Sequence, residues 1–314
     1  MARNPNQPTG GENGKRGSLY QDVTDKIIAE LEQGRVPWVQ PWSAAKVGVG
    51  MPENAATGRR YSGVNILILW AEVIEKGFPS QDWLTFRQCL DLGGHVSKGE
   101  HGTTVFYADR FVPKAEIERA AKEGDEPEAI PFLKRFTVFN VAQCDGVRRL
   151  PGKAERLPER AIIPTAEALI DATRADIRIG GDRAFYAPSG DYVQVPPQPA
   201  FFEQINFYRT CFHELSHWSG AAHRLNRNLS GRFGSQSYGR EELVAEMGSA
   251  FICASLNIVP TVRHADYLGA WLAILREDNH AIFRAASQAS KAADYILAFR
   301  DCGSEIVQPV EASA

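Results

Sequence analysis

The sequence predicts an α+β protein, because helical and strand patterns are both present and occupy separate stretches of its 314 residues. Residues 18–31 repeat apolar side chains at helical spacing, whereas 104–108 and 136–141 are rich in the β-branched and aromatic residues that favour strands. A second helical pattern, at 201–212, leads into two histidines four residues apart. The length suits two domains of ordinary size.

Composition is that of a soluble globular protein, with 44% hydrophobic and 23% charged residues. The longest apolar stretch, Val64–Val73, is interrupted by Asn65 and Glu72 and falls short of the ~20 residues that span a membrane. We therefore expect no membrane association. Five scattered cysteines without a CxxC spacing suit a reducing compartment, and the start of the chain lacks the apolar core of a signal peptide. Together these features predict a cytoplasmic protein.

The first part of the chain is predicted to be mainly helical before its strands begin. Residues 1–17 are rich in Asn, Gly, Pro and Gln and are expected to form a disordered tail. Helices are predicted at Ser18–Leu31, Asn65–Ala71 and Gln81–Leu92, the last ending at a glycine pair. Between the first two helices, prolines break the segment that carries Trp38 and Trp42.

The two strand patterns at 104–108 and 136–141 are expected to pair as a hairpin. The charged stretch between them, 113–130, has helix-forming content only at 116–123, which indicates a mobile excursion. Residues 148–158 are polar and contain prolines, as domain boundaries often do. The predicted domains are therefore 18–150 and 151–300, followed by a tail at 301–314.

The second part opens with a predicted helix at Pro164–Ala175, with its proline at the start, where the missing N–H costs nothing. Short strands follow at 177–179, 184–187 and 192–195, separated by glycine-containing turns. The helix after them is expected to end in a left-handed cap at Gly220.

The run His213-Glu-Leu-Ser-His217 carries most of the functional information. Imidazoles four residues apart lie on one face of an α-helix, so His213 and His217 can both ligate one zinc ion. Glu214 is then placed to take a proton from a water molecule, which is the general-base arrangement of a zinc metallopeptidase. The alternative is a helix with two surface histidines and an unrelated acidic helix after it.

The third ligand is open to three residues. Glu246 is preferred, because a carboxylate on an otherwise apolar helix is costly unless a metal or charge partner relieves it. Glu242, one turn earlier, could orient a ligand histidine or exchange roles with Glu246. His223 completes a metzincin spacing with Gly220, but no Met-turn is recognisable. We expect Zn²⁺, with Mn²⁺ as an alternative divalent ion.

The order helix, small sheet, metal helix and acidic helix is that of a zincin catalytic domain. In such a domain an edge strand binds an extended substrate through its backbone, and either 184–187 or 192–195 could be that edge. Tyr238 or His223 is a candidate to stabilise the oxyanion.

Charge alone gives no support to DNA binding. The net charge is −3, and the first 150 residues carry 19 Lys plus Arg against 19 Asp plus Glu. A nucleic-acid contact would therefore have to be a local patch.

Six motifs nevertheless occur in one order between residues 18 and 258: GRVPWVQPW at 34–42, TGRRYSGVN at 57–65, WLTFRQ at 83–88, GGHVSKGEHG at 93–102, FNVAQ at 139–143 and HELSHW at 213–218. In these motifs the chain closely resembles the ArdC antirestriction proteins of conjugative plasmids and the amino-terminal region of TraC primases.

The resemblance implies a single-stranded-DNA-binding domain followed by a zincin-like metallopeptidase domain, in a protein that protects incoming plasmid DNA during conjugation. The partners of such a protein would be single-stranded DNA and a protein substrate on DNA. The resemblance also favours a glutamate from 238–246 as the third metal ligand. Arg59, Arg60, Tyr61 and Lys98 are then the predicted DNA contacts. Trp38 and Trp42 either stack on bases or anchor the first helix in the core.

Two other functions stay open at this stage. One is a DNA-binding shield whose metal site is structural or regulatory. The other is an intracellular metallopeptidase with no DNA role.

Overall fold

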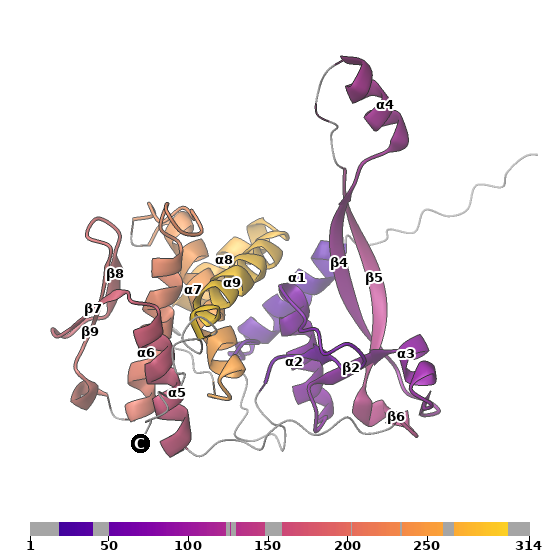
Figure 1. The fold of residues 1–314 in the computed structure, drawn as a ribbon, viewed down its shortest axis with the longest axis horizontal. Coiled ribbons are helices and arrows are strands. Elements are labelled where there is room, and N and C mark those ends of the chain that lie inside the picture. Colours follow the sequence, from indigo (N-terminus) through magenta and orange to yellow (C-terminus); the bar gives the residue numbers. More distant parts are fainter. Residues whose placement is uncertain are drawn as a thin grey trace, which may run out of the picture.

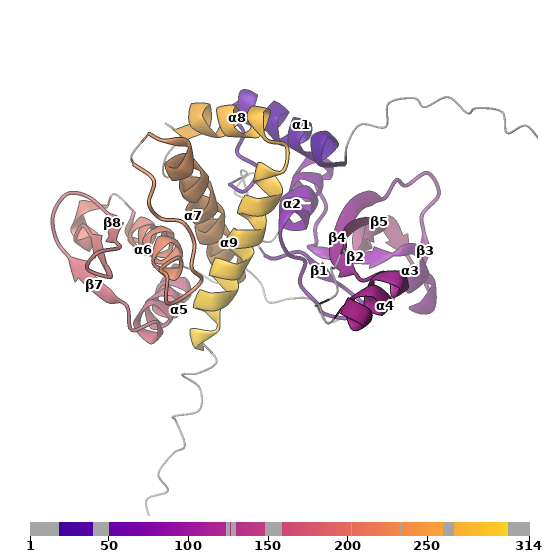
Figure 2. The ribbon, with the colours of Figure 1, turned by 90° about the horizontal axis from the view of Figure 1, so that it is seen from above.

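The computed structural model describes residues 19–39, 50–123, 126, 130–147, 159–201, 203–232, 234–259 and 267–300. The predicted tails and Trp42 lie outside these ranges. The α+β class is confirmed. Figures 1 and 2 show a first lobe that contains the larger sheet and a second lobe of helices with a small sheet. The two lobes meet where α1 and α2 lie beside α8 and α9.

The first lobe contains α1 (Leu19–Glu32), β1 (Glu53–Asn54), α2 (Val64–Lys76), β2 (Asp82–Thr85), α3 (Phe86–Asp91), β3 (His95–Val96), β4 (Thr103–Phe111), α4 (Lys114–Glu123), β5 (Ile130–Asn140) and β6 (Cys144–Asp145). Its main sheet has the order β1-β2-β5-β4. The predicted hairpin is confirmed, because all of β4 pairs antiparallel with residues 130–138 of β5. Helix α2 buries Leu67, Trp70 and Val73 and ends at Gly77, whose φ of 67° is left-handed.

The β4–β5 hairpin continues beyond the sheet as a two-stranded ribbon, with α4 at its tip (Figure 1). Helix α4 lies in the stretch where the sequence has helix-forming content. We call this hairpin the ribbon.

The predicted helix at 81–92 is wrong in its first half. Residues 82–85 form β2, in the interior of the sheet, where Trp83 and Leu84 are fully buried. The helix begins only after Thr85, whose side chain accepts from the backbone N–H of Gln88, while the Gln88 side chain caps Thr85 in return. This capping box at 85–88 is the local signal that marks the true start.

The second lobe contains α5 (Glu159–Ala172), β7 (Asp176–Ile179), β8 (Phe185–Ala187), β9 (Tyr192–Val195), α6 (Gln204–Ser219), α7 (Gln236–Ser255), α8 (Leu268–Glu277) and α9 (Ala281–Leu297). The predicted strands are confirmed. The predicted start of α5 at Pro164 is wrong, because the helix begins at Glu159 and Pro164 lies inside it. The small sheet has the order β7-β9-β8, so β9 is its central strand and β8 lies at an edge.

The last two helices pack against the first two. Trp38 meets Trp271 of α8 with ring centroids 5.4 Å apart, and the Thr24 hydroxyl donates to the carbonyl of Asn279 at 2.7 Å. The backbone N–H of Gly63 donates to Ser290 Oγ of α9 at 2.9 Å. One apolar core therefore runs from α1 to α9, across both predicted domains. Within the described ranges, no helix is long and apolar enough to span a membrane.

Candidate metal centre

Helix α6 is buried along almost its whole length, which fixes the direction of its histidines. It packs against α7, and Gly248 of α7 makes the close approach possible. A Cβ at Gly248 would lie 2.8 Å from Ser216 Oγ of α6. Glycine thus lets the two helices come together over the turn that carries His213 and His217.

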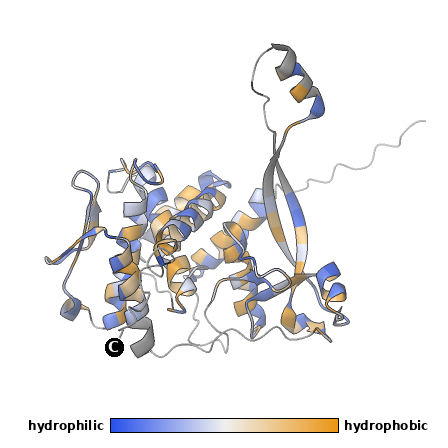
Figure 3. Ribbon diagram, in the orientation of Figure 1, coloured by the Kyte–Doolittle hydropathy of each residue, from blue (hydrophilic) through white to orange (hydrophobic). Residues whose placement is uncertain are grey.

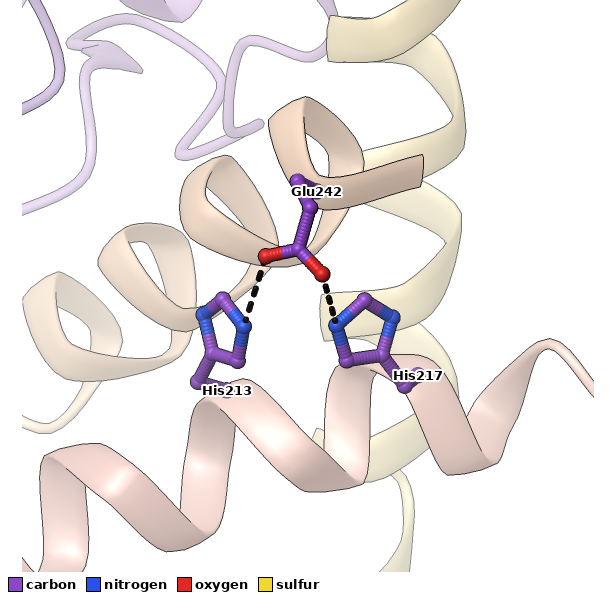
Figure 4. Close-up of side chains that lie close together, drawn as sticks. All are labelled: His213, His217 and Glu242. Carbon is purple, nitrogen blue, oxygen red and sulfur yellow. Dashed lines mark ion pairs between the residues drawn. The ribbon is translucent and has the colours of Figure 1, made fainter. Parts of the chain in front are cut away.

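The structure brings His213, His217 and Glu242 into one cluster (Figure 4). Glu242 Oε2 lies 3.5 Å from His213 Nε2, and Glu242 Oε1 lies 3.5 Å from His217 Nε2. The carboxylate of α7 therefore bridges the two imidazoles of α6. Glu242 and His213 are buried, with 4% and 2% exposure.

Glu246 lies behind His213 rather than between the two histidines. Its Oε1 lies 3.7 Å from Nδ1 of His213, on the side of the ring away from Nε2. The geometry thus favours Glu242 as third ligand and reverses the preference for Glu246. From this position Glu246 can orient His213.

Two further residues support the cluster and were not singled out from the sequence. Glu241 Oε1 lies 3.2 Å from His217 Nδ1, and Arg227 donates to both Glu241 oxygens at 2.8 and 3.1 Å. Arg227 also donates to the carbonyl of Ser216 at 2.6 Å. When Nδ1 donates to Glu241, Nε2 of His217 keeps its lone pair for a ligand. The sequence did offer a signal for Glu241, because it directly precedes Glu242, a predicted ligand.

Carboxylates dominate the electrostatics of the two histidines. Burial alone would favour protonated Glu242, but hydrogen bonds from His213 and His217 outweigh it and hold the pKa of that carboxyl far below its usual range. Burial likewise opposes charge on His217, yet Glu241 and Glu242 raise its pKa to about 10. The carboxylates that stabilise positive charge on His217 would also attract a divalent cation between these side chains.

The donor set fits such a cation. Two imidazole nitrogens and a carboxylate oxygen are a recognised catalytic zinc set, and their candidate ligand atoms all lie within 4.8 Å of one another. Zinc–ligand bonds of ~2.0–2.1 Å in a tetrahedral site place ligand atoms about 3.4 Å apart. Each histidine Nε2 lies 3.5 Å from an oxygen of Glu242, close to that spacing, with a different oxygen facing each ring.

The cluster opens into a cleft of about 490 Å³. Glu214, which is 4% exposed, lines this cleft beside His213 and His217. The opposite wall is β8, the edge strand, which contributes Phe185 and Tyr186. Of the two strands considered as a substrate edge, β8 therefore faces the site, while β9 is paired on both sides.

Tyr238 and Tyr267 also line the cleft, with their hydroxyl oxygens 3.2 Å apart. Burial, Tyr267 and Glu242 raise the pKa of Tyr238, so its phenol remains a proton donor at neutral pH. His223 is elsewhere: it is 64% exposed and lies 3.3 Å from Asp191. Gly220 ends α6 with a right-handed φ of −78°, so the predicted left-handed cap is wrong.

The predicted DNA contacts are spread over the first lobe. Arg59 and Lys98 are exposed, and Arg60 is exposed with its Nε 3.4 Å from Glu53. Tyr61 is half-buried against the core. Trp38 is fully buried against Trp271 and cannot stack on a base, which removes it from the candidate DNA contacts.

Two family models match successive parts of the chain. The family model for the N-terminal domain of the anti-restriction factor ArdC matches residues 17–139, and the model for a zincin-like metallopeptidase matches residues 164–288. The crystal structure of the metal-free antirestriction protein ArdC from plasmid R388 superposes with a TM-score of 0.75 and 38% identity, covering 91% of this chain and 99% of that one. The chain belongs to the ArdC family of antirestriction proteins.

Other relatives of this ArdC-family protein differ in length. The protein y4eC of Sinorhizobium fredii, which is uncharacterized, is 40% identical over 94% of both chains. A DNA primase TraC of Escherichia coli is 36% identical over 90% of this chain, which spans 27% of the primase. The Mn(II)-bound structure of R388 ArdC matches with a TM-score of 0.74 and 37% identity, covering 90% of this chain and 98% of that one. The zincin-like domain and this Mn(II)-bound relative together support a divalent metal ion as the cofactor.

Proposed function

We propose that the protein binds single-stranded DNA and protects incoming plasmid DNA during conjugation, while its second lobe hydrolyses peptide bonds. Similarity to the antirestriction protein ArdC over 91% of the chain supports the first role. The bridge that Glu242 forms between His213 and His217, beside Glu214 and an edge strand, carries the second.

In the proposed chemistry His213, His217 and Glu242 hold the cation, which supplies Lewis acidity that polarises the scissile carbonyl. Strand β8 binds the substrate backbone as an added strand. Glu214 accepts a proton from the attacking water as the new C–O bond forms, and passes it to the leaving amine as the C–N bond breaks. The Tyr238 phenol donates a hydrogen bond to the oxyanion.

The peptidase role is tested with purified protein loaded with Zn²⁺ or Mn²⁺ and a labelled unfolded casein. Glu214→Gln should abolish cleavage and leave metal content unchanged, whereas the exposed Glu75→Gln of α2 should change neither. Cleavage retained in Glu214→Gln would refute this assignment.

The protective role is tested by plasmid transfer into recipients with and without a restriction system. Loss of the protein from the recipient should lower transfer only where restriction is present. Glu214→Gln then separates the two roles: full protection by this variant would mean that the DNA-binding lobe shields the plasmid without peptide hydrolysis.

A further inference from the structure

The ribbon carries two large aromatic side chains that are exposed to solvent. Tyr107 of β4 is 51% exposed and Phe136 of β5 is 45% exposed. Their ring centroids lie 6.4 Å apart at an interplanar angle of 78°. Neighbouring exposed rings of this size indicate an interaction site rather than a fold requirement.

The strand register places a cation beside the two rings. Tyr107 is opposite Lys134, and Phe136 is opposite Val105. Because side chains alternate between the faces of a strand, Tyr107, Lys134 and Phe136 share one face of the ribbon, and Arg135 belongs to the other. We call these three residues the ribbon face. Lys134 is exposed, as its neighbours on this face are.

The β4–β5 hairpin, which carries the ribbon face, extends away from the body of the molecule toward α4 (Figure 1). On the same face of the hairpin, Val105, which is opposite Phe136, and Val138 are buried in the core, with 4% and 2% exposure. The exposed rings therefore border the buried part of this face. Figure 3 shows the resulting mixture of hydrophobic and hydrophilic colours along the described part of the ribbon.

Aromatic faces next to a cation suit single-stranded DNA. Unpaired bases stack on aromatic rings whatever their sequence, and ammonium groups neutralise the phosphates between them. A β-ribbon in the major groove of a duplex would instead need amide or guanidinium groups that reach base edges. The two rings are also tilted by 78°, so a chain stacking on both must turn between bases, which an unpaired strand does easily.

We propose that the ribbon face is the surface on which the protein stacks two bases of single-stranded DNA, with Lys134 contacting the phosphate between them. This assignment rests on the proposed DNA-binding function and adds the contact surface to it. The ribbon face is a different surface from the loops that carry Arg59, Arg60 and Lys98, because none of these residues lies on the ribbon.

The test uses the full-length protein and a fluorescein-labelled 15-nucleotide oligothymidine, followed by anisotropy. Tyr107→Ala combined with Phe136→Ala should weaken binding ~30-fold or more, since stacking contributes about 1–3 kcal/mol per base. Tyr107→Phe combined with Phe136→Tyr keeps both rings and should bind as the wild type does.

Two matched controls lie close by in the same lobe. Phe86 of α3 is 54% exposed and contacts Phe139, which is on the other face of β5 from Phe136. Phe86→Ala should leave affinity within about twofold of wild type, within the usual scatter of surface substitutions. Lys134→Gln should reduce the slope of the logarithm of the binding constant against the logarithm of the salt concentration by about 0.7, because one phosphate is no longer neutralised. Arg135→Gln should reduce this slope less.

A direct readout comes from Tyr107→Trp. Five native tryptophans, Trp38, Trp70, Trp83, Trp218 and Trp271, are buried, so a tryptophan at 107 adds an exposed fluorophore at the ribbon face. Its emission, measured against wild type, should be quenched on adding oligothymidine.

The outcomes separate this inference from the proposed function. Wild-type binding with unchanged emission from Tyr107→Trp and full affinity in the double alanine variant would overturn the ribbon face and keep the DNA-binding role. Preference for duplex over single strand would overturn the ribbon face as well. No wild-type binding to either would overturn both.

Discussion

Gly248 of α7 rests against Ser216 of α6 so closely that a single added methyl group would come within 2.8 Å of the serine hydroxyl. The carboxylate of Glu242 and the imidazole of His213 belong to the same two helices. The distance between these helices therefore sets both the packing of the core and the size of the metal site.

We predict that Gly248→Ala costs about 1–3 kcal/mol of unfolding free energy, as overpacking in a dense core does, and weakens metal binding at the same time. Thermal unfolding and metal titration measure the two effects. Gly269 of α8 is the matched control, because nothing lies within 4 Å of a Cβ placed there. Gly269→Ala should leave metal binding unchanged and stabilise its helix by about 0.5–1 kcal/mol. Equal metal affinity in wild type and Gly248→Ala would contradict the coupling.

Glu242→Gln should lose more metal affinity than Glu246→Gln. The first removes a ligand charge that faces both Nε2 atoms, whereas the second alters a group behind His213, where losses of about 10–100-fold are usual. Competition against a fluorescent chelator gives both values. The reverse order would return Glu246 to the position of third ligand.

Tyr238→Phe should lower the turnover number for peptide cleavage by about 10²–10³, the usual effect of removing an oxyanion donor. Metal content and the Michaelis constant should change little, because the ring still fills its place at the cleft. His223→Ala removes the other candidate donor and should leave turnover unchanged. Steady-state kinetics of the two variants decide between them.

Asp191 provides a pH-dependent contribution to stability. The Arg224 guanidinium beside it holds its pKa below the usual value, so the folded state favours the carboxylate. Such a group stabilises the fold above its unfolded pKa of about 3.9, and the contribution disappears as pH falls through the lower folded pKa. Asp191→Asn should therefore melt below wild type at pH 7, and the gap should close below about pH 4. A gap that is constant down to pH 3 would contradict this origin.

Local patterns were enough for the metal helix and for the ribbon. His213 and His217 share a face because of their spacing alone, and the pairing of β4 with β5 follows from strand patterns on either side of a charged stretch. The helix at 81–92 was misassigned because burial in the sheet interior overrides helical propensity at Trp83 and Leu84.

Choices that depend on distant packing were out of reach of the sequence. Glu242 and Glu246 are one turn apart on α7, and only the packing of α7 against α6 shows that Glu242 faces both histidines. Trp38 is buried by Trp271, which follows it by more than 200 residues. No local pattern could show that partner.

The position of α8 and α9 has a consequence for synthesis on the ribosome. Helix α1 rests on residues near the end of the chain, including Asn279, which the Thr24 hydroxyl contacts. At about 5–20 residues per second, the ribosome delivers those residues roughly 10–50 s after α1. Over that interval the first helix lacks the native surface that α8 and Asn279 provide, so its final packing is completed only after these later residues have been made.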